Sequence, residues 1–393
     1  MRLMPRLAAT AALCLLPLAA PALDTSARAA MVVEHETGTV LLAKNVDTPL
    51  PPASMSKLMT LAMLFDALKE GRLSLDNKFR VSAKAAAMQG SSMFLREGEQ
   101  VTVRDLIPGI IVQSGNDACV VVAEALAGSE KDFAAAMTRR AQELGMTNST
   151  FANASGWPDP RQRMSVRDLV TLARYLIDNF PDDPEKEGDY GNFSQRVFKF
   201  DGRVPSNIHN RHPLLGQVIG GDESIVVDGL KTGHTKEAGY GLVASAVRGD
   251  RRIVLVITGL PTAKSRLEES ERLLSWAFRE FRTGKLFDKG QEIATADVWL
   301  GEAPGVPLVT AEEITATLPY GSGKKVSARA VFKGPVTAPV EKGQPIGELV
   351  IEAEGLEPIT VPLLAGKAVA RAGFLQRAEV TAGMLFERVL AQF

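Results

Sequence analysis

The residues from Lys57 to Gly71, KLMTLAMLFDALKEG, set the strongest limit on the fold of this chain. From Leu58 to Leu68 almost every residue is apolar, which is typical of a helix that is apolar on all sides. Such a helix needs other elements around it, because a surface helix keeps one polar face. The 393 residues suffice for two domains of about 100–250 residues each. We therefore expect a large domain packed around this helix, with room for a second domain.

Candidate strands lie on both sides of this helix in the sequence. Residues 29–47 predict two short strands around a turn at Thr37-Gly38. Residues 228–260 predict further strands with a turn at Gly249-Asp250. Residues 264–281 follow with helical spacing, and their apolar side chains Leu267, Leu274, Phe278 and Phe281 share one face. We expect one sheet built from both groups of strands and covered by this last helix, with helical runs between residues 100 and 180.

The composition changes after residue 283. Residues 284–371 consist of short alternating runs such as KVSARAVF and IGELVIEA, separated by Gly and Pro, which is typical of a small all-β domain. The spacing of apolar residues in 372–393 predicts an amphipathic helix. Its apolar face comprises Leu375, Ala378, Ala382, Leu385, Phe386, Val389, Leu390 and Phe393. This face would either attach to a membrane surface or pack against the β domain.

The first 22 residues predict a signal peptide. Arg2 and Arg6 are followed by the apolar run LAATAALCLLPLAA, and Ala20-Pro21-Ala22 fits a small-residue cleavage site. The mature chain would start at Leu23, and the alternative is an uncleaved anchor. Cleavage removes one of the two cysteines and leaves Cys119, which cannot form an internal disulfide and reads as a small buried hydrophobe.

Charge and metal-ligand patterns exclude some classes of function. The formal net charge of −1 gives no reason to expect a nucleic-acid partner. His209 and His212 read as loop residues, and no metal-ligand spacing is present. We therefore expect no metal and no cofactor, and look for the function in local motifs.

Three short motifs carry the chemistry. They are Ser54-Met55-Ser56-Lys57, Ser114-Gly115-Asn116 and Lys231-Thr232-Gly233. Each is weak by itself: Ser54 could cap a helix above a solvated lysine, Ser114 and Asn116 are common at helix starts, and the third motif could end an ordinary strand. All three in this order are the signature of serine acyl-transferases of the penicillin-binding and β-lactamase type.

The first motif supplies what a serine nucleophile needs. A serine hydroxyl is a poor nucleophile at neutral pH and requires an adjacent base. Helix positions i and i+3 face the same side, so Lys57 lies beside Ser54, and the helix N-terminus favours developing negative charge. Lys57 acts as a base only when neutral, and burial or a second cation such as Lys231 lowers its pKa.

The longer stretches PPASMSKLMT, SGNDA and VDGLKTGHTKEAGYGLVASA resemble the low-molecular-weight penicillin-binding proteins that act as D-alanyl-D-alanine carboxypeptidases. The resemblance covers the whole mature chain. It implies an α/β catalytic domain of β-lactamase/DD-peptidase type over residues 23–283, with an antiparallel sheet flanked by helices plus a helical subdomain. The all-β domain would then occupy residues 284–371, and a membrane-associating helix residues 372–393.

The resemblance also implies roles for the motif residues. Ser54 is the nucleophile, Lys57 its base, and Ser114 relays a proton to the leaving amine. Asn116 holds the substrate amide. Lys231 and Thr232 bind the terminal carboxylate, Gly233 lets the substrate lie close to the strand, and His234 contributes its backbone N–H to the oxyanion site.

The implied substrates are peptidoglycan stem pentapeptides, from which the enzyme removes the terminal D-alanine, and β-lactam antibiotics would be covalent inhibitors. The implied location is the periplasm, with peripheral attachment to the outer face of the cytoplasmic membrane. Two alternatives stay open: a non-catalytic wall-binding scaffold and a β-lactam-hydrolysing relative. The chain lacks the Glu-x-x-Leu-Asn loop of class A β-lactamases and has Ser-Gly-Asn as its second motif, so we expect slow release of penicillin.

Overall fold

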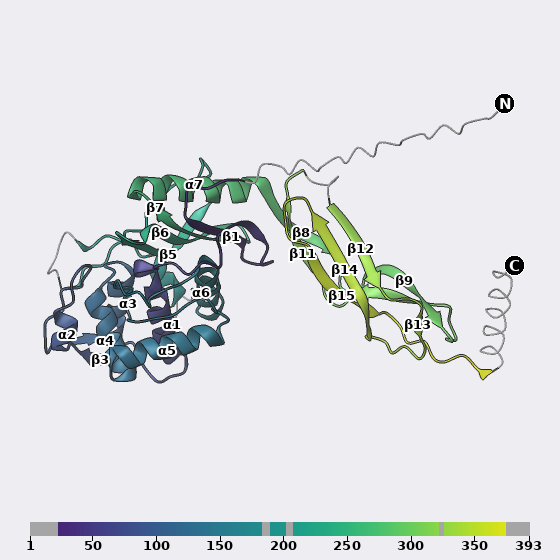
Figure 1. Ribbon diagram of the computed structural model, residues 1–393, viewed down its shortest axis with the longest axis horizontal. Coiled ribbons are helices and arrows are strands. Elements are labelled where there is room, and N and C mark those ends of the chain that lie inside the picture. Colours follow the sequence, from purple (N-terminus) through teal and green to yellow (C-terminus); the bar gives the residue numbers. More distant parts are fainter. Residues whose placement is uncertain (1–22, 183–188, 202–206, 322–325, 375–393) are drawn as a thin grey trace, which may run out of the picture.

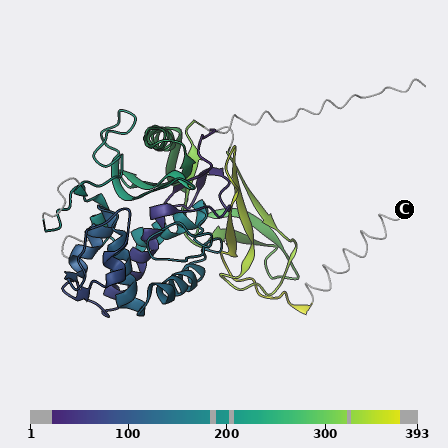
Figure 2. The same ribbon diagram turned by 60° about the vertical axis from the view of Figure 1, so that its left-hand side comes forward.

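A computed structural model describes residues 23–182, 189–201, 207–321 and 326–374. These residues form two bodies that lie side by side (Figures 1 and 2). One is a mixed helix and sheet domain, and the other is an elongated domain made of strands. The expected signal peptide and nearly all of the expected C-terminal helix, residues 375–393, lie outside the described residues.

The first domain is organised by a five-stranded antiparallel sheet in the order β2-β1-β7-β6-β5. Its strands are β1 (Ala29–Glu34), β2 (Val40–Lys44), β5 (Val226–Thr235), β6 (Gly239–Arg248) and β7 (Arg251–Leu260). Strands from both ends of the domain therefore meet in one sheet, as the sequence predicts. The turns at Gly38 and Gly249 also fall where expected, and both glycines have a positive φ.

Helices cover both faces of this sheet (Figure 1). One face carries α7 (Ala263–Glu280), which packs Leu274 and Phe278 against the sheet. The opposite face carries the helical part of the domain. It comprises α1 (Lys57–Lys69), α2 (Ala83–Ala86), α3 (Val103–Ile111), α4 (Asn116–Ala127), α5 (Glu130–Glu143) and α6 (Val166–Asn179), the 3₁₀ turns η1 (Ala53–Ser56) and η2 (Tyr190–Ser194), and the small hairpin of β3 (Lys78–Arg80) and β4 (Gln100–Thr102).

Helix α1 occupies the centre of this larger core, as its sequence requires. Its buried residues surround the helix axis and include Leu58, Leu61, Leu64 and Phe65. The helix ends at Lys69, and Gly71 follows with φ +70°, a conformation that glycine adopts without a Cβ clash. The buried α1 fixes the position of the residues at its N-terminus, where the first motif lies.

The second domain is all-β. A six-stranded sheet runs in the order β12-β14-β15-β10-β9-β13, and β8 pairs with β11 in a separate two-stranded ribbon. The strands are β8 (Phe281–Phe287), β9 (Glu292–Trp299), β10 (Gly305–Thr310), β11 (Ile314–Pro319), β12 (Val326–Phe332), β13 (Val336–Thr337), β14 (Pro345–Ala353) and β15 (Ile359–Ala365). The sheet and ribbon enclose one apolar core, so the predicted small all-β domain is confirmed.

The two domains meet without a linker, since α7 ends at Glu280 and β8 begins at Phe281. The domain division expected between residues 283 and 284 therefore falls inside β8. Thr37 Oγ1 and Thr317 Oγ1 lie 2.9 Å apart across the junction, and the Tyr320 N–H donates to Glu280 O.

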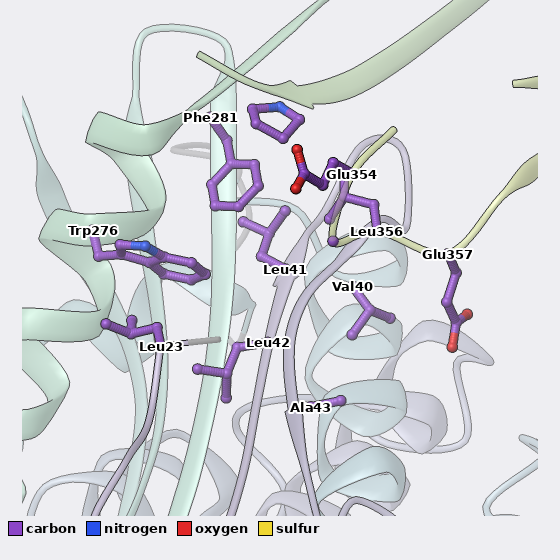
Figure 3. A pocket seen from close by; sticks show the side chains of 12 residues that line it. Leu23, Val40, Leu41, Leu42, Ala43, Trp276, Phe281, Glu354, Leu356 and Glu357 are labelled. Atoms are coloured by element: carbon purple, nitrogen blue, oxygen red, sulfur yellow. The ribbon is translucent and has the colours of Figure 1, made fainter. Parts of the chain in front are cut away.

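An apolar cavity of about 510 Å³ lies at the junction. Figure 3 shows Leu41 and Leu42 of β2 facing Trp276 of α7, with Leu356 of the β domain closing the far side. Within the described residues, no helix is long and apolar enough to cross a membrane.

Candidate active site

Ser54 lies in η1, the 3₁₀ turn that leads directly into α1. In a 3₁₀ turn the side chains at i and i+3 eclipse each other, so Lys57 is brought over Ser54 more closely than in an α-helix. Ser54 is half-buried, whereas Lys57 is fully buried. No side-chain capping hydrogen bond is present at η1 or at α1. Ser54 is therefore not a helix cap, and Lys57 is not solvated.

The Lys57 amine has three hydrogen-bond partners. Nζ lies 2.9 Å from Ser54 Oγ, 2.8 Å from Asn116 Oδ1 and 2.7 Å from the Ser155 carbonyl oxygen. The last two atoms accept hydrogen bonds and cannot donate, so each takes one N–H of the amine. A neutral amine then has only its lone pair left to face Ser54. In that state Ser54 donates its hydroxyl proton to Lys57, which is the arrangement that a general base requires.

Burial makes the neutral state of Lys57 accessible. Desolvation lowers the pKa of Lys57 to about 8, and the nearby Arg211 guanidinium acts in the same direction. Burial, followed by the proximity of Lys57, holds the pKa of Lys231 well below its usual value. Burial also raises the pKa of the Cys119 thiol to about 12, so this fully buried cysteine stays protonated, in keeping with the predicted hydrophobe.

The second motif lies at the start of α4. Ser114 has φ +57°, an unusual backbone conformation for a residue with a side chain, and its hydroxyl is buried without a hydrogen-bond partner in the described structure. Gly115 is the N-cap of α4, with no side-chain capping bond. Asn116 accepts from Lys57 through Oδ1 and donates to Gln89 O at 2.7 Å through Nδ2. Neither Ser114 nor Asn116 acts as a helix cap.

Two charged residues, the exposed Arg211 and the buried Asp117, hold the loops around this motif by hydrogen bonds. Arg211 donates to the Gln113 carbonyl at 2.7 Å and to Ser91 Oγ at 2.6 Å. Asp117 accepts from Ser92 Oγ and from the N–H groups of residues 93, 95 and 118. These hydrogen bonds hold the loop before α4 in the conformation that places the Ser114 hydroxyl inside the site.

The third motif lies in β5, and its position explains the glycine. Lys231 and Thr232 are buried within the strand. A Cβ at Gly233 would lie 2.8 Å from the Pro52 carbonyl oxygen, so only glycine lets β5 approach the turn that carries Ser54. This neighbour is the protein's own backbone, whereas the sequence prediction invoked the substrate. His234 is exposed, and its ring stacks on Tyr240 with 3.9 Å between ring centroids.

Two further residues of the site were not found from the sequence. Arg266 of α7 is buried, lies over the Tyr240 ring at 5.6 Å, and leaves Nε without a partner. His212 is buried with both ring nitrogens unpartnered, and desolvation together with Arg266 and Lys231 lowers its pKa to about 3. The signal for Arg266 was its spacing: it falls four residues before the buried Ser270, on the face of α7 that packs against the sheet. No comparable signal marks His212 or Arg211.

The site is rich in basic side chains that lack a carboxylate partner at ion-pair distance. Within the described residues, none of Lys57, Lys231, Arg211 and Arg266 forms an ion pair with a carboxylate. Buried cations without counter-ions are costly, and an anionic ligand relieves that cost. The described residues contain no group of His, Cys, Asp or Glu that could hold a metal ion. The arrangement therefore combines an activated hydroxyl with a binding site for an anion.

Comparison with known proteins yields one consistent family. A family model described as D-alanyl-D-alanine carboxypeptidase matches residues 17–262, and one described as penicillin-binding protein 5, C-terminal domain, matches residues 281–371. The D-alanyl-D-alanine carboxypeptidase DacC of Escherichia coli is 37% identical over 91% of this chain and 87% of its own length. The carboxypeptidase DacF of Bacillus subtilis is 33% identical over 91% of this chain and 89% of its own length.

Similar solved structures belong to the same family. Penicillin-binding protein 5 of Haemophilus influenzae has a TM-score of 0.74 and 34% identity, over 88% of this chain and 98% of its own. Penicillin-binding protein D2 of Listeria monocytogenes, solved in its ampicillin-bound form, has a TM-score of 0.57 and 31% identity, over 66% of this chain and all of its own. The serine beside a buried lysine, the two-domain fold and these matches together place the chain in the family of D-alanyl-D-alanine carboxypeptidases, serine peptidases of family S11.

Proposed function

We propose that this protein removes the terminal D-alanine from peptidoglycan stem pentapeptides by way of an acyl-enzyme on Ser54. The observation that carries the proposal is the contact between Ser54 Oγ and the buried Lys57 amine, whose two other partners are acceptors only. Lys57 takes the hydroxyl proton as Ser54 attacks the carbonyl of the penultimate D-alanine. The terminal D-alanine leaves, and water then hydrolyses the ester and frees Ser54.

The neighbouring residues have distinct roles in this reaction. Ser114, with its buried and unpartnered hydroxyl, relays the proton from Lys57 to the leaving amine. Asn116 binds the substrate amide while it orients Lys57. Backbone N–H groups of Ser54 and His234 hold the oxyanion, and the loss of one such donor typically costs about 2.7–4 kcal/mol of barrier stabilisation.

The terminal carboxylate of the substrate binds basic side chains that lack a carboxylate partner. Lys231 and Thr232 of β5 contact it, and Arg266 adds a second positive charge from α7. A carboxylate in this place gives Lys231 and Arg266 an anionic partner, since neither forms an ion pair with a carboxylate among the described residues. A substrate without that carboxylate therefore binds poorly, which distinguishes a carboxypeptidase from a general acyl-transferase.

The direct test is D-alanine release from a diacyl-Lys-D-Ala-D-Ala peptide, measured with and without penicillin. We expect release that penicillin abolishes, together with a labelled penicillin bound at Ser54 in a one-to-one burst. The Ser54→Ala variant provides the control, with neither release nor label. A wall-binding scaffold would show no label, and a β-lactamase would turn the penicillin over without accumulating it.

We further propose that the protein is exported to the periplasm through residues 1–22 and attached peripherally to the outer face of the cytoplasmic membrane by residues 372–393. The all-β domain serves as the stalk between that attachment and the catalytic domain. Its family match and its direct continuity with α7 support this role. The boundaries 23–283, 284–371 and 372–393 remain predictions from the sequence.

A further inference from the structure

The ring of Tyr240 contacts two residues of the active site. The His234 imidazole stacks on this ring, with 3.9 Å between the ring centroids and 27° between the ring planes. The Arg266 guanidinium also lies over the Tyr240 ring, with Cζ 5.6 Å from its centroid. His234 directly follows the third motif, and Arg266 belongs to the proposed carboxylate site. Tyr240 itself has no role in the reaction proposed above.

The register of β5 and β6 fixes the position of this ring. Tyr240 stands directly opposite His234 in the antiparallel pair, and Leu242 stands opposite Thr232. Directly opposed side chains lie on the same face of a sheet, and residues two apart along a strand share that face. Thr232, His234 and Tyr240 therefore project from one face. This face is the one covered by α7, because Tyr240 packs against the apolar cluster that contains Leu274 of that helix.

Arg266 reaches the same face from α7, and few groups hold its guanidinium. The side chain is 8% exposed, and its buried Nε has no hydrogen-bond partner in the described structure. Within the residues that the structure describes, Arg266 forms no ion pair with a carboxylate. An arginine side chain has many rotamers, and a guanidinium that is free to move loses this freedom when it binds a ligand. Among the described side chains, the Tyr240 ring is thus the contact that restrains Arg266.

An aromatic ring is suited to this task. Its negative face attracts a guanidinium, and the attraction is stronger where water is excluded. Tyr240 is half-buried and Arg266 is buried, so the contact is partly shielded from solvent. The contact uses none of the N–H groups of Arg266 in a hydrogen bond. The donors on the two terminal nitrogens therefore stay available for the two oxygens of a carboxylate.

The stacked imidazole completes the arrangement, because it fixes the tyrosine ring from β5. Aromatic pairs at this centroid distance stabilise each other's orientation. His234 is exposed, and its backbone N–H is a proposed oxyanion donor. The Tyr240 ring therefore lies between the two places where the proposed reaction presents negative charge, the oxyanion at His234 and the terminal carboxylate at Arg266.

We propose that Tyr240 is a positioning residue, which holds the Arg266 guanidinium in the orientation that binds the terminal carboxylate of the substrate. The inference rests on the proposed carboxypeptidase activity and adds to it a residue that acts through Arg266. The role belongs to the aromatic ring, since the Tyr240 hydroxyl forms no hydrogen bond within the described residues.

The test measures whether Tyr240 and Arg266 act as a unit. D-Alanine release from diacyl-Lys-D-Ala-D-Ala gives kcat and KM for the full chain and for Tyr240→Leu, Arg266→Gln and the double variant. We expect Tyr240→Leu alone to lower kcat/KM about three- to tenfold, mainly by raising KM, because one partly shielded cation–ring contact is lost. In the Arg266→Gln background the same change should alter kcat/KM by less than about twofold, because the guanidinium that the ring orients is absent.

Further variants exclude simpler explanations. Tyr240→Phe keeps the ring and should keep kcat/KM within about twofold of the wild type. Tyr320→Leu is the matched control, because Tyr320 also lies under an arginine, with Arg282 Cζ 4.8 Å from its ring centroid, but belongs to the β domain. This control should keep the wild-type kcat/KM. Thermal unfolding is measured for each variant, and Tyr240→Met replaces Tyr240→Leu in the comparison if the leucine variant does not fold.

The outcomes separate this role from the proposed activity. An equal loss of kcat/KM on Tyr240→Leu in both backgrounds indicates a structural contribution and overturns the positioning role. An unchanged kcat/KM in Tyr240→Leu overturns it too, as does a Tyr240→Phe variant that is as slow as Tyr240→Leu. In these cases the wild-type chain still releases D-alanine. Absence of release by the wild-type chain overturns the carboxypeptidase activity itself.

Discussion

At the scale of single residues, the chemistry depends on Lys57. This side chain is fully buried yet has no carboxylate partner, and its amine is held by two acceptors and one hydroxyl. Burial lowers the pKa of this amine to about 8, beside the serine that it deprotonates in the proposed reaction. The contacts with Asn116 Oδ1 and the Ser155 carbonyl orient the amine, and its contact with Ser54 Oγ places its lone pair toward the hydroxyl.

Replacing Lys57 by alanine should abolish acylation of Ser54 without unfolding the protein. The change removes the base, and it also removes a buried amine that costs solvation energy, so the loss of stability is small compared with the loss of rate. Labelling by fluorescent penicillin would fall at least 100-fold while the thermal unfolding midpoint stays within a few degrees. Acylation at a near-normal rate would exclude Lys57 as the base.

The rate of acylation should also depend on pH in a predictable direction. The active form of Lys57 is the neutral amine, and its pKa is about 8. The second-order rate constant for penicillin acylation should therefore rise about tenfold per pH unit below pH 8 and level off above it, as expected for a general base. Stopped-flow or quench measurements between pH 6 and 9 test this; a rate independent of pH in that range contradicts it.

At the scale of elements, the site depends on the close approach of β5 and the turn η1. Gly233 lets the strand approach the Pro52 carbonyl, and Gly156, with φ +79°, lies against the neighbouring Ala53 carbonyl. The turn that carries Ser54 thus lies close to two glycines. The structure places these contacts on rigid backbone, so an added methyl group must displace the nucleophile.

Gly233→Ala should therefore lower the acylation rate more than it lowers stability. The new Cβ would lie 2.8 Å from Pro52 O, closer than real Cβ contacts, so the strand or the turn must shift, and even a shift well below about 1 Å at a reacting atom lowers the rate. Gly284→Ala in β8 is the matched control, because nothing lies within 4 Å of its added Cβ. Penicillin labelling rates and thermal unfolding of both variants provide the measurement; equal rates would show that η1 tolerates the displacement.

The elements also show what the sequence could and could not predict. Ser54 and Lys57 were predictable because their contact arises within one helical turn, and α1 because its apolar residues surround the axis. Arg211 and His212 could not be predicted as site residues. They lie in loops, and loop sequences have no hydrophobic periodicity from which a position could be inferred.

At the scale of the whole molecule, the two domains have separate cores and are joined directly, without a linker. The β domain lies at the β2 edge of the catalytic sheet, and Leu356 packs toward the apolar face shared by the sheet and α7 (Figure 3). The active site faces the helical side of that sheet, away from the junction. The proposed attachment through residues 372–393 would therefore leave the catalytic contacts unchanged.

Removal of residues 372–393 should release the mature protein from the membrane fraction and leave its activity on soluble peptides intact. The predicted helix offers six large apolar side chains, each contributing about 1.5–3 kcal/mol if fully buried. Sedimentation of membranes followed by immunodetection, with D-alanine release from the supernatant, measures both properties. Retention of the shortened protein in the membrane pellet would instead favour a helix that packs on the β domain.

The lack of a linker between α7, which ends at Glu280, and β8, which begins at Phe281, has a geometric consequence. Because the helix continues directly into the strand, there is no linker segment to serve as a hinge. The position of the catalytic serine relative to the β domain therefore varies less than it would with a flexible linker. With the membrane attachment proposed above, the long dimension of the β domain would set the distance from the membrane at which D-alanine is removed. In that arrangement, a longer or shorter β domain would move the active site farther from or closer to the membrane without altering a catalytic contact.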